Sequence, residues 1–171
     1  RDRGNYIHRY VAAKLEGKSM GHGQYWRWLK HLDPLLKGIA DVNSGPIFIE
    51  QQVYDLELGY AGTFDFLVRL PGEGDRLCIC DLKTCGYKAW PIAIHTAQLQ
   101  AAAYAWAWNR STHVLQAEVI ATIHVSPYGL HLETSEGNVV ADLMAEFSDR
   151  LRWFASMTTE RLTDERVFED A

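Results

Sequence analysis

Residues 77–83 constrain the fold more than any other segment, because they place two opposite charges on an otherwise apolar strand. Asp81 and Lys83 are separated by a single residue, Leu82. Side chains two positions apart on a strand point to the same side of a sheet, so Asp81 and Lys83 are expected to stand side by side while Leu82 turns into the core. Charges that lose their water need a partner or a metal ion. The segment therefore predicts a polar site set into a sheet, with an ordinary structural ion pair as the alternative.

The periodicity of apolar residues along the rest of the chain predicts helices around that sheet. The expected helices are 1–16, 24–38, 92–109 and 138–156, and the expected strands are 47–57, 63–70, 77–83, 113–125 and 130–134. Pro34 is expected to kink or end the second helix, and the charged segment from Thr158 onward is expected to fray or form a short helix. The first three strands, joined by turns, are expected to form an antiparallel meander. This order predicts an α/β (α+β) fold, a central mixed β-sheet flanked by helices.

A chain of 171 residues suits one domain, since cores seldom divide below about 250 residues. The expected single domain, 1–171, has N-terminal basic helices at 1–40, a catalytic core at 46–134, and a C-terminal helix and tail at 138–171. The sequence contains no signal peptide and no apolar run of about 18 residues, so no membrane association and a cytoplasmic location are expected.

Cysteine usage and charge exclude some functions and leave others open. Cys78, Cys80 and Cys85 are too few for a disulfide framework or a four-ligand zinc or iron–sulfur site, so Cys78 and Cys80 are expected to be small buried residues. The net charge of −5 disfavours nucleic-acid binding by itself. Residues 1–37, however, carry eight basic and three acidic side chains. This basic end suits phosphate contacts, and a solvated helix face is an equally good interpretation.

Two further acids are expected near Asp81. Asp65 lies on the preceding strand and Glu50 on the first strand, and antiparallel neighbours can bring both close to Asp81. Clustered carboxylates repel each other, and a cation such as Mg²⁺ relieves that repulsion through oxygen ligands. Such an ion activates water and neutralises the charge that builds on a phosphate. Lys83 would then position or deprotonate the attacking water, or stabilise the developing charge.

Several motifs in one order resemble the PD-(D/E)xK nuclease superfamily, in its RecB-like exonuclease branch. The matching motifs are Gly4-Asn5-Tyr6-Ile7-His8, Gly62-Thr63-Phe64-Asp65, Asp81-Leu82-Lys83-Thr84 and Gln100-Ala101-Ala102-Ala103-Tyr104. The resemblance runs from His8 to Tyr104, more than half of the chain. It implies a restriction-endonuclease-like core and a metal-dependent DNA nuclease, of which an exonuclease is the preferred form.

The resemblance also implies a role for each matching residue. Mg²⁺ or Mn²⁺ would be held by His8, Asp65, Asp81 and the backbone carbonyl of Leu82. Lys83 would be the catalytic lysine.

Further roles follow for the residues around that centre. Glu50 matches the family's acid on the first core strand, which supports the catalytic group. Gln100 and Tyr104, one helical turn apart, would touch the nucleic acid or orient catalytic groups. Thr84 and Lys88 adjoin the loop after the catalytic strand and are expected to contact the substrate.

Some relatives carry an iron–sulfur cluster bound by four cysteines, which is not expected here. The chain looks more like the small nucleases encoded by phages, which implies DNA and phage recombination or replication proteins as partners, inside a bacterial host cell. A restriction-type or junction-resolving endonuclease and an inactive nucleic-acid-binding module are the alternatives. Strand polarity, strandedness and the formation of a homo-oligomer stay open.

Other aromatic residues and histidines carry weaker expectations. Tryptophans are mostly core residues, but some stack on unpaired bases. The candidates for stacking are Trp26, Trp28, Trp90, Trp106 and Trp108, and the histidines expected to be structural are His22, His31, His95, His113, His124 and His131.

Overall fold

The computed structural model describes residues 2–44, 47–87, 91–111 and 114–169, with side chains described up to residue 157. Its elements are α1 (Asp2–Leu15), η1 (Gly23–Tyr25), α2 (Trp26–Val42), β1 (Phe48–Asp55), β2 (Tyr60–Arg69), β3 (Leu77–Thr84), α3 (Pro91–Arg110), β4 (Val119–Ser126), β5 (Gly129–Glu136) and α4 (Gly137–Glu169). Apart from the short 3-10 turn η1, this is the predicted order of helices and strands.

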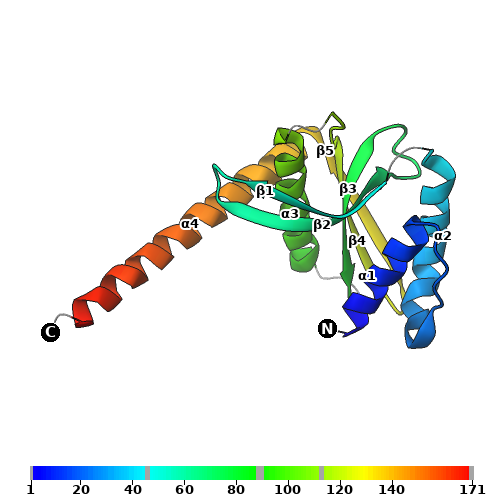
Figure 1. Ribbon diagram of the computed structural model, residues 1–171, viewed down its shortest axis with the longest axis horizontal. Helices are drawn as coiled ribbons and strands as arrows, with labels where there is room; N and C mark the ends of the chain where they lie inside the picture. The colour runs from blue at the N-terminus through cyan, green and yellow to red at the C-terminus, as the bar shows by residue number, and fades with distance from the viewer. Residues whose placement is uncertain (1, 45–46, 88–90, 112–113, 170–171) are drawn as a thin grey trace.

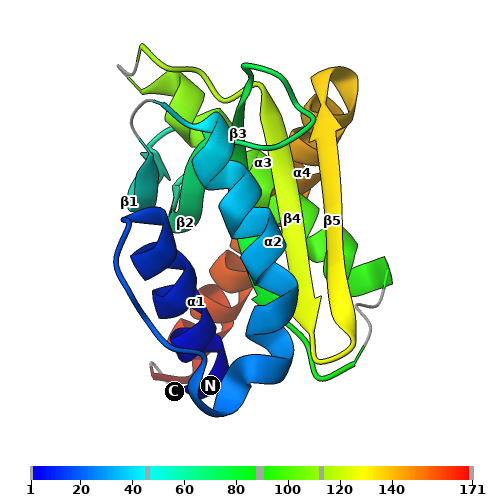
Figure 2. The ribbon, with the colours of Figure 1, turned by 90° about the vertical axis from the view of Figure 1, so that its right-hand side faces the viewer.

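The strands form one mixed sheet in the order β1-β2-β3-β4-β5. The first three strands pair antiparallel, as predicted for a meander, and β4 pairs antiparallel with β5. Strands β3 and β4 run parallel, because α3 returns the chain to the other end of the sheet between them. Figures 1 and 2 show α1 and α2 on one face of the sheet and α3 with the first part of α4 on the other. The predicted α/β fold with a central mixed sheet is confirmed.

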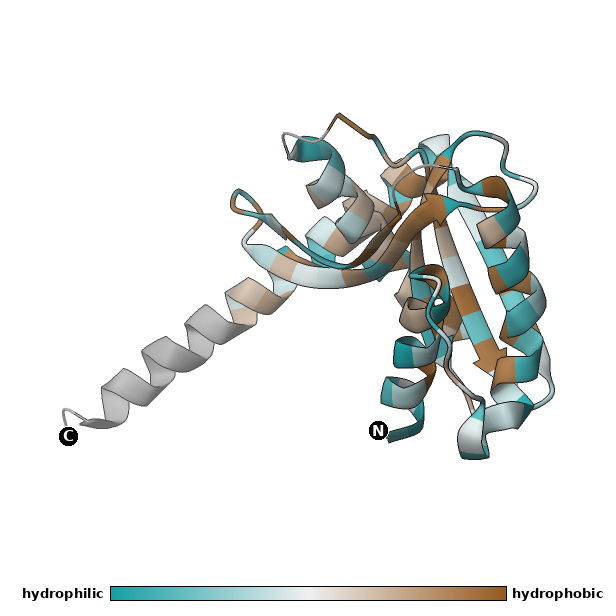
Figure 3. Cartoon of the chain, turned by 45° about the vertical axis from the view of Figure 1, so that its right-hand side comes forward, coloured by the Kyte–Doolittle hydropathy of each residue, from teal (hydrophilic) through white to brown (hydrophobic). Residues whose placement is uncertain are grey.

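Each face of the sheet buries its own apolar core. Under α1 and α2, side chains such as Ile7 and Leu29 pack against Leu82 and Ile123. Cys78 and Cys80 belong to this core as buried free thiols, which confirms their predicted place. Under α3 and α4 the core is built largely from the alanines of α3 around Trp108. The central strands are mostly hydrophobic in colour, whereas the outer faces of α1 and α2 are mostly hydrophilic (Figure 3).

Two expectations about helix ends were wrong. Helix α2 does not end at Pro34 but runs through it to Val42. Pro34 is exposed, so the carbonyl that loses its helical hydrogen bond faces water, while Leu32 and Leu36 keep the helix packed on the sheet. Helix α4 does not fray at Thr158 but continues to Glu169 and leaves the body of the molecule (Figure 1). Of the helices in the described residues, none has the length and apolar character to span a membrane.

Candidate active site

The candidate site lies where β2 and β3 stop pairing. Their ladder ends at the pair Phe66 and Cys80, whereas β3 stays paired with β4 as far as Thr84. The N–H of Leu82 lies beyond the ladder and donates instead to Oδ2 of Asp65, at 2.6 Å. A buried N–H needs an acceptor, so the Asp65 carboxylate takes the place of a strand carbonyl. This bond fixes Asp65 against the backbone between Asp81 and Lys83.

The other oxygen of Asp65 faces helix α1. Its Oδ1 lies 2.8 Å from Nδ1 of His8. The hydrogen bond to Asp65 is the main reason that the pKa of His8 is raised, and burial of the imidazole opposes it. Asp65 therefore joins α1 to β3, and it holds His8 at the gap in the sheet.

Asp81 and Lys83 stand on the α3 side of the same gap, next to each other as predicted. Asp81 is only 3% exposed. Lys83 Nζ lies 2.9 Å from Oδ1 and 2.8 Å from Oδ2, but only the contact with Oδ1 has hydrogen-bond geometry. Oδ2 therefore has no hydrogen bond from any described residue and is held by charge attraction alone. Burial raises the pKa of Asp81, and the Lys83 ammonium opposes that rise.

Helix α3 supplies a polar relay that directs Lys83. Gln100 Oε1 accepts a hydrogen bond from Lys83 Nζ at 2.9 Å, and Gln100 Nε2 donates to the Tyr104 hydroxyl at 2.6 Å. A methyl group on Gly62 would lie 2.3 Å from the Tyr104 ring, so only glycine fits there. This close approach is a physical reason for the glycine three residues before Asp65. Gln98, two residues before Gln100 on the same helix, donates a hydrogen bond to Glu133 on β5 instead.

Glu50 borders the site from β1. It lies opposite Asp65, between the pairs Ile49 with Phe66 and Gln51 with Phe64, but does not itself pair. Its φ of 50° lies in the left-handed region, which costs a residue with a Cβ about 1 kcal/mol or more. Its side chain is exposed and lines the same hollow as His8.

Of the predicted substrate residues Thr84 and Lys88, only Thr84 is described by the structure, and it does not face Gln100 and Tyr104. Thr84 follows Lys83 on β3, and a methyl group on Gly4 would lie 3.6 Å from its hydroxyl, so it faces α1 rather than α3. Lys88 and Trp90 lie outside the described residues. Trp108 is a core residue, and Trp106 donates a hydrogen bond to Asp55 away from this site.

Two buried polar residues on β4, Thr122 and His124, were not among the predicted site residues. Thr122 pairs in register with Asp81 and His124 pairs with Lys83, so both extend the polar row on the α3 face. The Thr122 hydroxyl and His124 Nε2 are buried and accept or donate no hydrogen bond among the described residues. Burial lowers the pKa of His124, which favours a neutral imidazole beside Lys83. Only the parallel register brings these residues here, and no local pattern encodes that register.

A divalent metal ion fits the donor atoms at the gap in part. Asp65 and Asp81 offer hard oxygens and His8 an imidazole, a set that suits Mg²⁺ or Mn²⁺ completed by water. The buried Oδ2 of Asp81 accepts no hydrogen bond from the described residues and lies 2.8 Å from the Lys83 ammonium, so a metal ion bound there would take over part of the charge neutralisation that Lys83 supplies. Within the described residues, no three His, Cys, Asp or Glu side chains already form a ligand group. Metal binding would therefore require one of two arrangements. Either the His8–Asp65 hydrogen bond breaks so that both residues bind the ion, or it is kept and one of the two residues orients the other without binding the ion itself.

Comparison with known proteins adds little. No family model matches the chain, and no curated protein matches it. Among solved structures it is similar to one described as "Crystal structure of SSO0001", with 14% sequence identity and a TM-score of 0.44. The match covers 86% of this chain and 58% of that one, so this chain spans little more than half of its length. At this TM-score the likeness carries no argument about fold or function.

Proposed function

We propose that this chain is a metal-dependent DNA nuclease that hydrolyses phosphodiester bonds. The observation that supports the proposal is the convergence of Asp65, Asp81 and Lys83 at one break in the sheet, with a buried carboxylate oxygen lacking a hydrogen bond. Lys83 Nζ lies 2.8 Å from this oxygen but donates its hydrogen bond to Oδ1, so Oδ2 keeps lone pairs that a metal ion could bind. A buried carboxylate of this kind beside a lysine suits a metal ion and an anionic substrate.

In this proposal each residue has a separate task. Asp65, Asp81 and His8 would hold Mg²⁺ or Mn²⁺, with the Leu82 carbonyl as a further ligand. When bound, the ion supplies charge stabilisation at the phosphate and lowers the pKa of a bound water.

Lys83, whose side chain is 40% exposed, would reach the scissile phosphate and donate a hydrogen bond as negative charge develops. The hydrogen bonds from Lys83 to Gln100 and from Gln100 to Tyr104 would hold the Lys83 ammonium in one orientation. Less conformational entropy is then lost when the substrate binds.

We infer exonuclease rather than endonuclease action from the Gln100 and Tyr104 pair, which matches the exonuclease branch of the resembled superfamily. The test uses end-labelled linear DNA and closed circular DNA, each with Mg²⁺, with Mn²⁺ and with EDTA. Stepwise loss of linear substrate, intact circles and no cleavage in EDTA are expected. Cleavage of closed circles would replace the exonuclease proposal with the endonuclease, and cleavage in EDTA would overturn metal dependence.

Matched variants test the assigned lysine. Lys83→Gln is expected to lower the cleavage rate about 10²- to 10³-fold, because the charge beside the phosphate is lost. Lys37→Gln is the control, since Lys37 is an exposed lysine on α2 that pairs with Asp41. Full activity of Lys83→Gln, with an unchanged circular dichroism spectrum, would contradict the proposed role.

A second pair tests the glutamine relay on α3. Gln100→Ala is expected to slow cleavage about tenfold, because Lys83 loses one of the groups that direct it. Gln98→Ala, which removes a glutamine of the same helix bonded to β5, is expected to leave the rate within about twofold. Equal losses in the two variants would show that any polar change on α3 disturbs the site, and would contradict a specific role for Gln100.

A further inference from the structure

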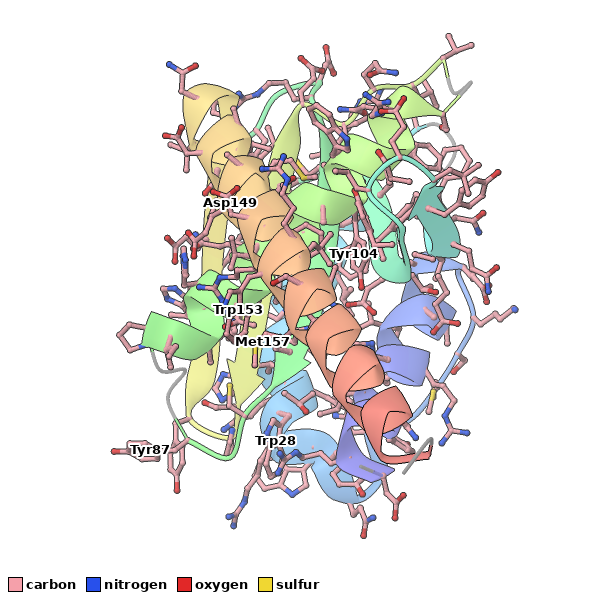
Figure 4. The ribbon with its side chains drawn as sticks, turned by 90° about the vertical axis from the view of Figure 1, so that its left-hand side faces the viewer. Trp28, Tyr87, Tyr104, Asp149, Trp153 and Met157 are labelled. Atoms are coloured by element: carbon pink, nitrogen blue, oxygen red, sulfur yellow. The ribbon has the colours of Figure 1, made fainter. Side chains whose placement is uncertain are left out.

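Aromatic rings, and cations that form no ion pair among the described residues, gather at the end of the sheet where β3 ends, and all but Arg3 and Trp28 are exposed. We call this surface the aromatic rim. Its members come from the starts of α1 and α2, from the segment after β3 and from the β4–β5 turn: Arg3, Trp26, Arg27, Trp28, Lys30, Tyr87 and Tyr128. Figure 4 shows Trp28 and Tyr87 toward the same end of the molecule, whereas Trp153 and Met157 lie on α4.

The aromatic rim is tied directly to the catalytic strand. The Arg3 guanidinium lies 5.1 Å from the centre of the Trp28 ring. Trp28 in turn donates its indole N–H to the carbonyl of Cys85 at 2.8 Å, two residues beyond Lys83. A hollow of about 680 Å³ then follows α1 from Asp2 to His8 and Glu50. The aromatic rim is therefore connected to the candidate site through Cys85, directly after the end of the catalytic strand, and none of the rim residues lines this hollow.

The cations of the rim are available to an external anion. Lys30 Nζ lies 5.3 Å from the Trp26 ring centre and the Arg27 guanidinium 5.6 Å from it, so one exposed ring carries two flanking positive charges. Trp26 is 49% exposed. Among the described residues, Arg3, Arg27 and Lys30 form no ion pair with a carboxylate, whereas Lys37 of the same helix does. These three cations, of the 17 lysines and arginines in the sequence, form a local positive patch in a chain whose net charge is −5.

A second pair of rings extends the rim to the other side of the sheet end. Tyr87 and Tyr128 are both exposed, and their rings meet edge to face with centroids 5.3 Å apart. Hydrophobic burial does not explain either ring, because each leaves most of its surface in water. Exposed rings interleaved with cations are the arrangement by which proteins stack unpaired bases and follow a phosphate backbone.

We propose that the aromatic rim binds single-stranded DNA and leads it to the site at Asp81 and Lys83. This rests on the proposed nuclease function and specifies its substrate. The bases of a duplex are covered by their own stack and cannot lie on Trp26 or Tyr128, whereas an unpaired strand offers a π-face at every nucleotide. The cations beside Trp26 would meet the phosphates on either side of a stacked base.

The test measures binding without cleavage, by fluorescence anisotropy of a labelled oligothymidine in EDTA. Trp26→Ala is expected to weaken binding about tenfold, since stacking of one base accounts for roughly that factor. Trp26→Phe, which keeps a ring, is expected to recover most of the affinity. Trp153→Ala is the matched control, because it removes an exposed tryptophan of α4 outside the rim. Binding by Trp26→Ala equal to that of the unaltered protein, or an equal loss with Trp153→Ala, would overturn the proposal.

Salt dependence tests the cations separately. The double variant Arg27→Gln with Lys30→Gln is expected to lower the slope of log K against log salt by about 1.4, at about 0.7 for each phosphate contact to a single strand. An unchanged slope would overturn their role. An equal effect of Trp26→Ala on duplex DNA would overturn the assignment to an unpaired strand.

Two further results separate this proposal from the nuclease function. If the unaltered protein binds oligothymidine through Trp26 but never cleaves it with Mg²⁺ or Mn²⁺, the nuclease function fails and the rim stands as a binding surface. If it cleaves DNA while Trp26→Ala binds and cleaves normally, the rim fails and the nuclease function stands.

Discussion

Two buried aspartates, Asp55 and Asp81, lie on neighbouring parts of the same sheet and are satisfied very differently. Asp55, at the end of β1, is 6% exposed. Its Oδ1 accepts the N–H groups of Glu57 and Leu58, both at 2.9 Å, in the turn that follows. Its Oδ2 accepts the indole N–H of Trp106 at 3.0 Å and lies 3.3 Å from Nε of Arg110. Both oxygens of Asp55 thus accept hydrogen bonds.

Asp81 is buried to a similar degree but receives one hydrogen bond, from Lys83, and its Oδ2 receives none from the described residues. The difference shows that burial of a carboxylate does not by itself mark a functional site. A carboxylate satisfied on both oxygens fixes the fold, here by tying the β1–β2 turn to α3. A carboxylate left incomplete costs stability and has a reason to remain only if something else completes it.

The largest expected effect is on catalysis, from Asp81→Asn. Loss of the carboxylate charge is expected to lower the cleavage rate about 10³-fold, because the group that would hold the metal is neutralised. The free energy of unfolding in EDTA is expected to change by less than about 1 kcal/mol, since an amide is easier to bury than an incompletely bonded carboxylate. Initial cleavage rates and urea unfolding measure the two quantities. A folded Asp81→Asn protein with normal activity would contradict the proposed functional role of Asp81 and its contrast with Asp55.

The same substitution at Asp55 is expected to have the opposite outcome. In Asp55→Asn the amide keeps one oxygen to accept hydrogen bonds but presents an N–H₂ group to the indole N–H of Trp106, which is also a donor, and the charge attraction to Arg110 is lost. The free energy of unfolding is expected to fall by about 3 kcal/mol. Cleavage per folded molecule, measured below the unfolding transition, is expected to stay within about threefold. A loss of activity without a loss of stability would mean that Asp55 is not structural.

Metal linkage offers a test that does not depend on cleavage. Free Mn²⁺ at about one hundred times its dissociation constant is expected to raise the free energy of unfolding by about 2.7 kcal/mol, as for any ligand that binds only the folded state. The increase should vanish in Asp81→Asn and persist in Asp55→Asn. Urea unfolding with and without Mn²⁺ measures it. A stabilisation that survives in Asp81→Asn would place the ion elsewhere.

The smallest expected effect concerns Glu50, an exposed carboxylate at the edge of the gap between β2 and β3. Its left-handed backbone favours glycine, so Glu50→Gly is expected to raise the free energy of unfolding by about 0.5–1 kcal/mol while lowering the cleavage rate. The neighbour Gln51→Gly is the control, because Gln51 pairs normally in the β1–β2 ladder and glycine there should destabilise by a similar amount. A loss of stability in Glu50→Gly would contradict the strain at this position.

Much of the fold could be predicted because local periodicity survives in the finished structure. The alternating pattern of residues 77–83 correctly puts Asp81 beside Lys83 and buries Cys78 and Cys80 on the other face. The i, i+4 spacing of Gln100 and Tyr104 correctly puts them in contact. At Pro34 the local signal was misleading. The proline predicted a kink or an end of the helix, but the helix continues because neighbouring leucines pack on the sheet.

The sequence by itself determined which residues share a strand face or a helix turn, because these depend on the geometry of adjacent residues alone. It could not determine that β2 pairs with β3 only from Phe66 onward, so that the Asp65 side chain meets the N–H of Leu82. Nor could it determine the parallel register that puts His124 beside Lys83. Those arrangements join segments far apart in the chain, and only the packing of helices on both faces of the sheet selects them. On the strand that carries Asp81 and Lys83, the sequence determined the two charges. The tertiary structure decided that one oxygen of Asp81 would accept no hydrogen bond from the described residues.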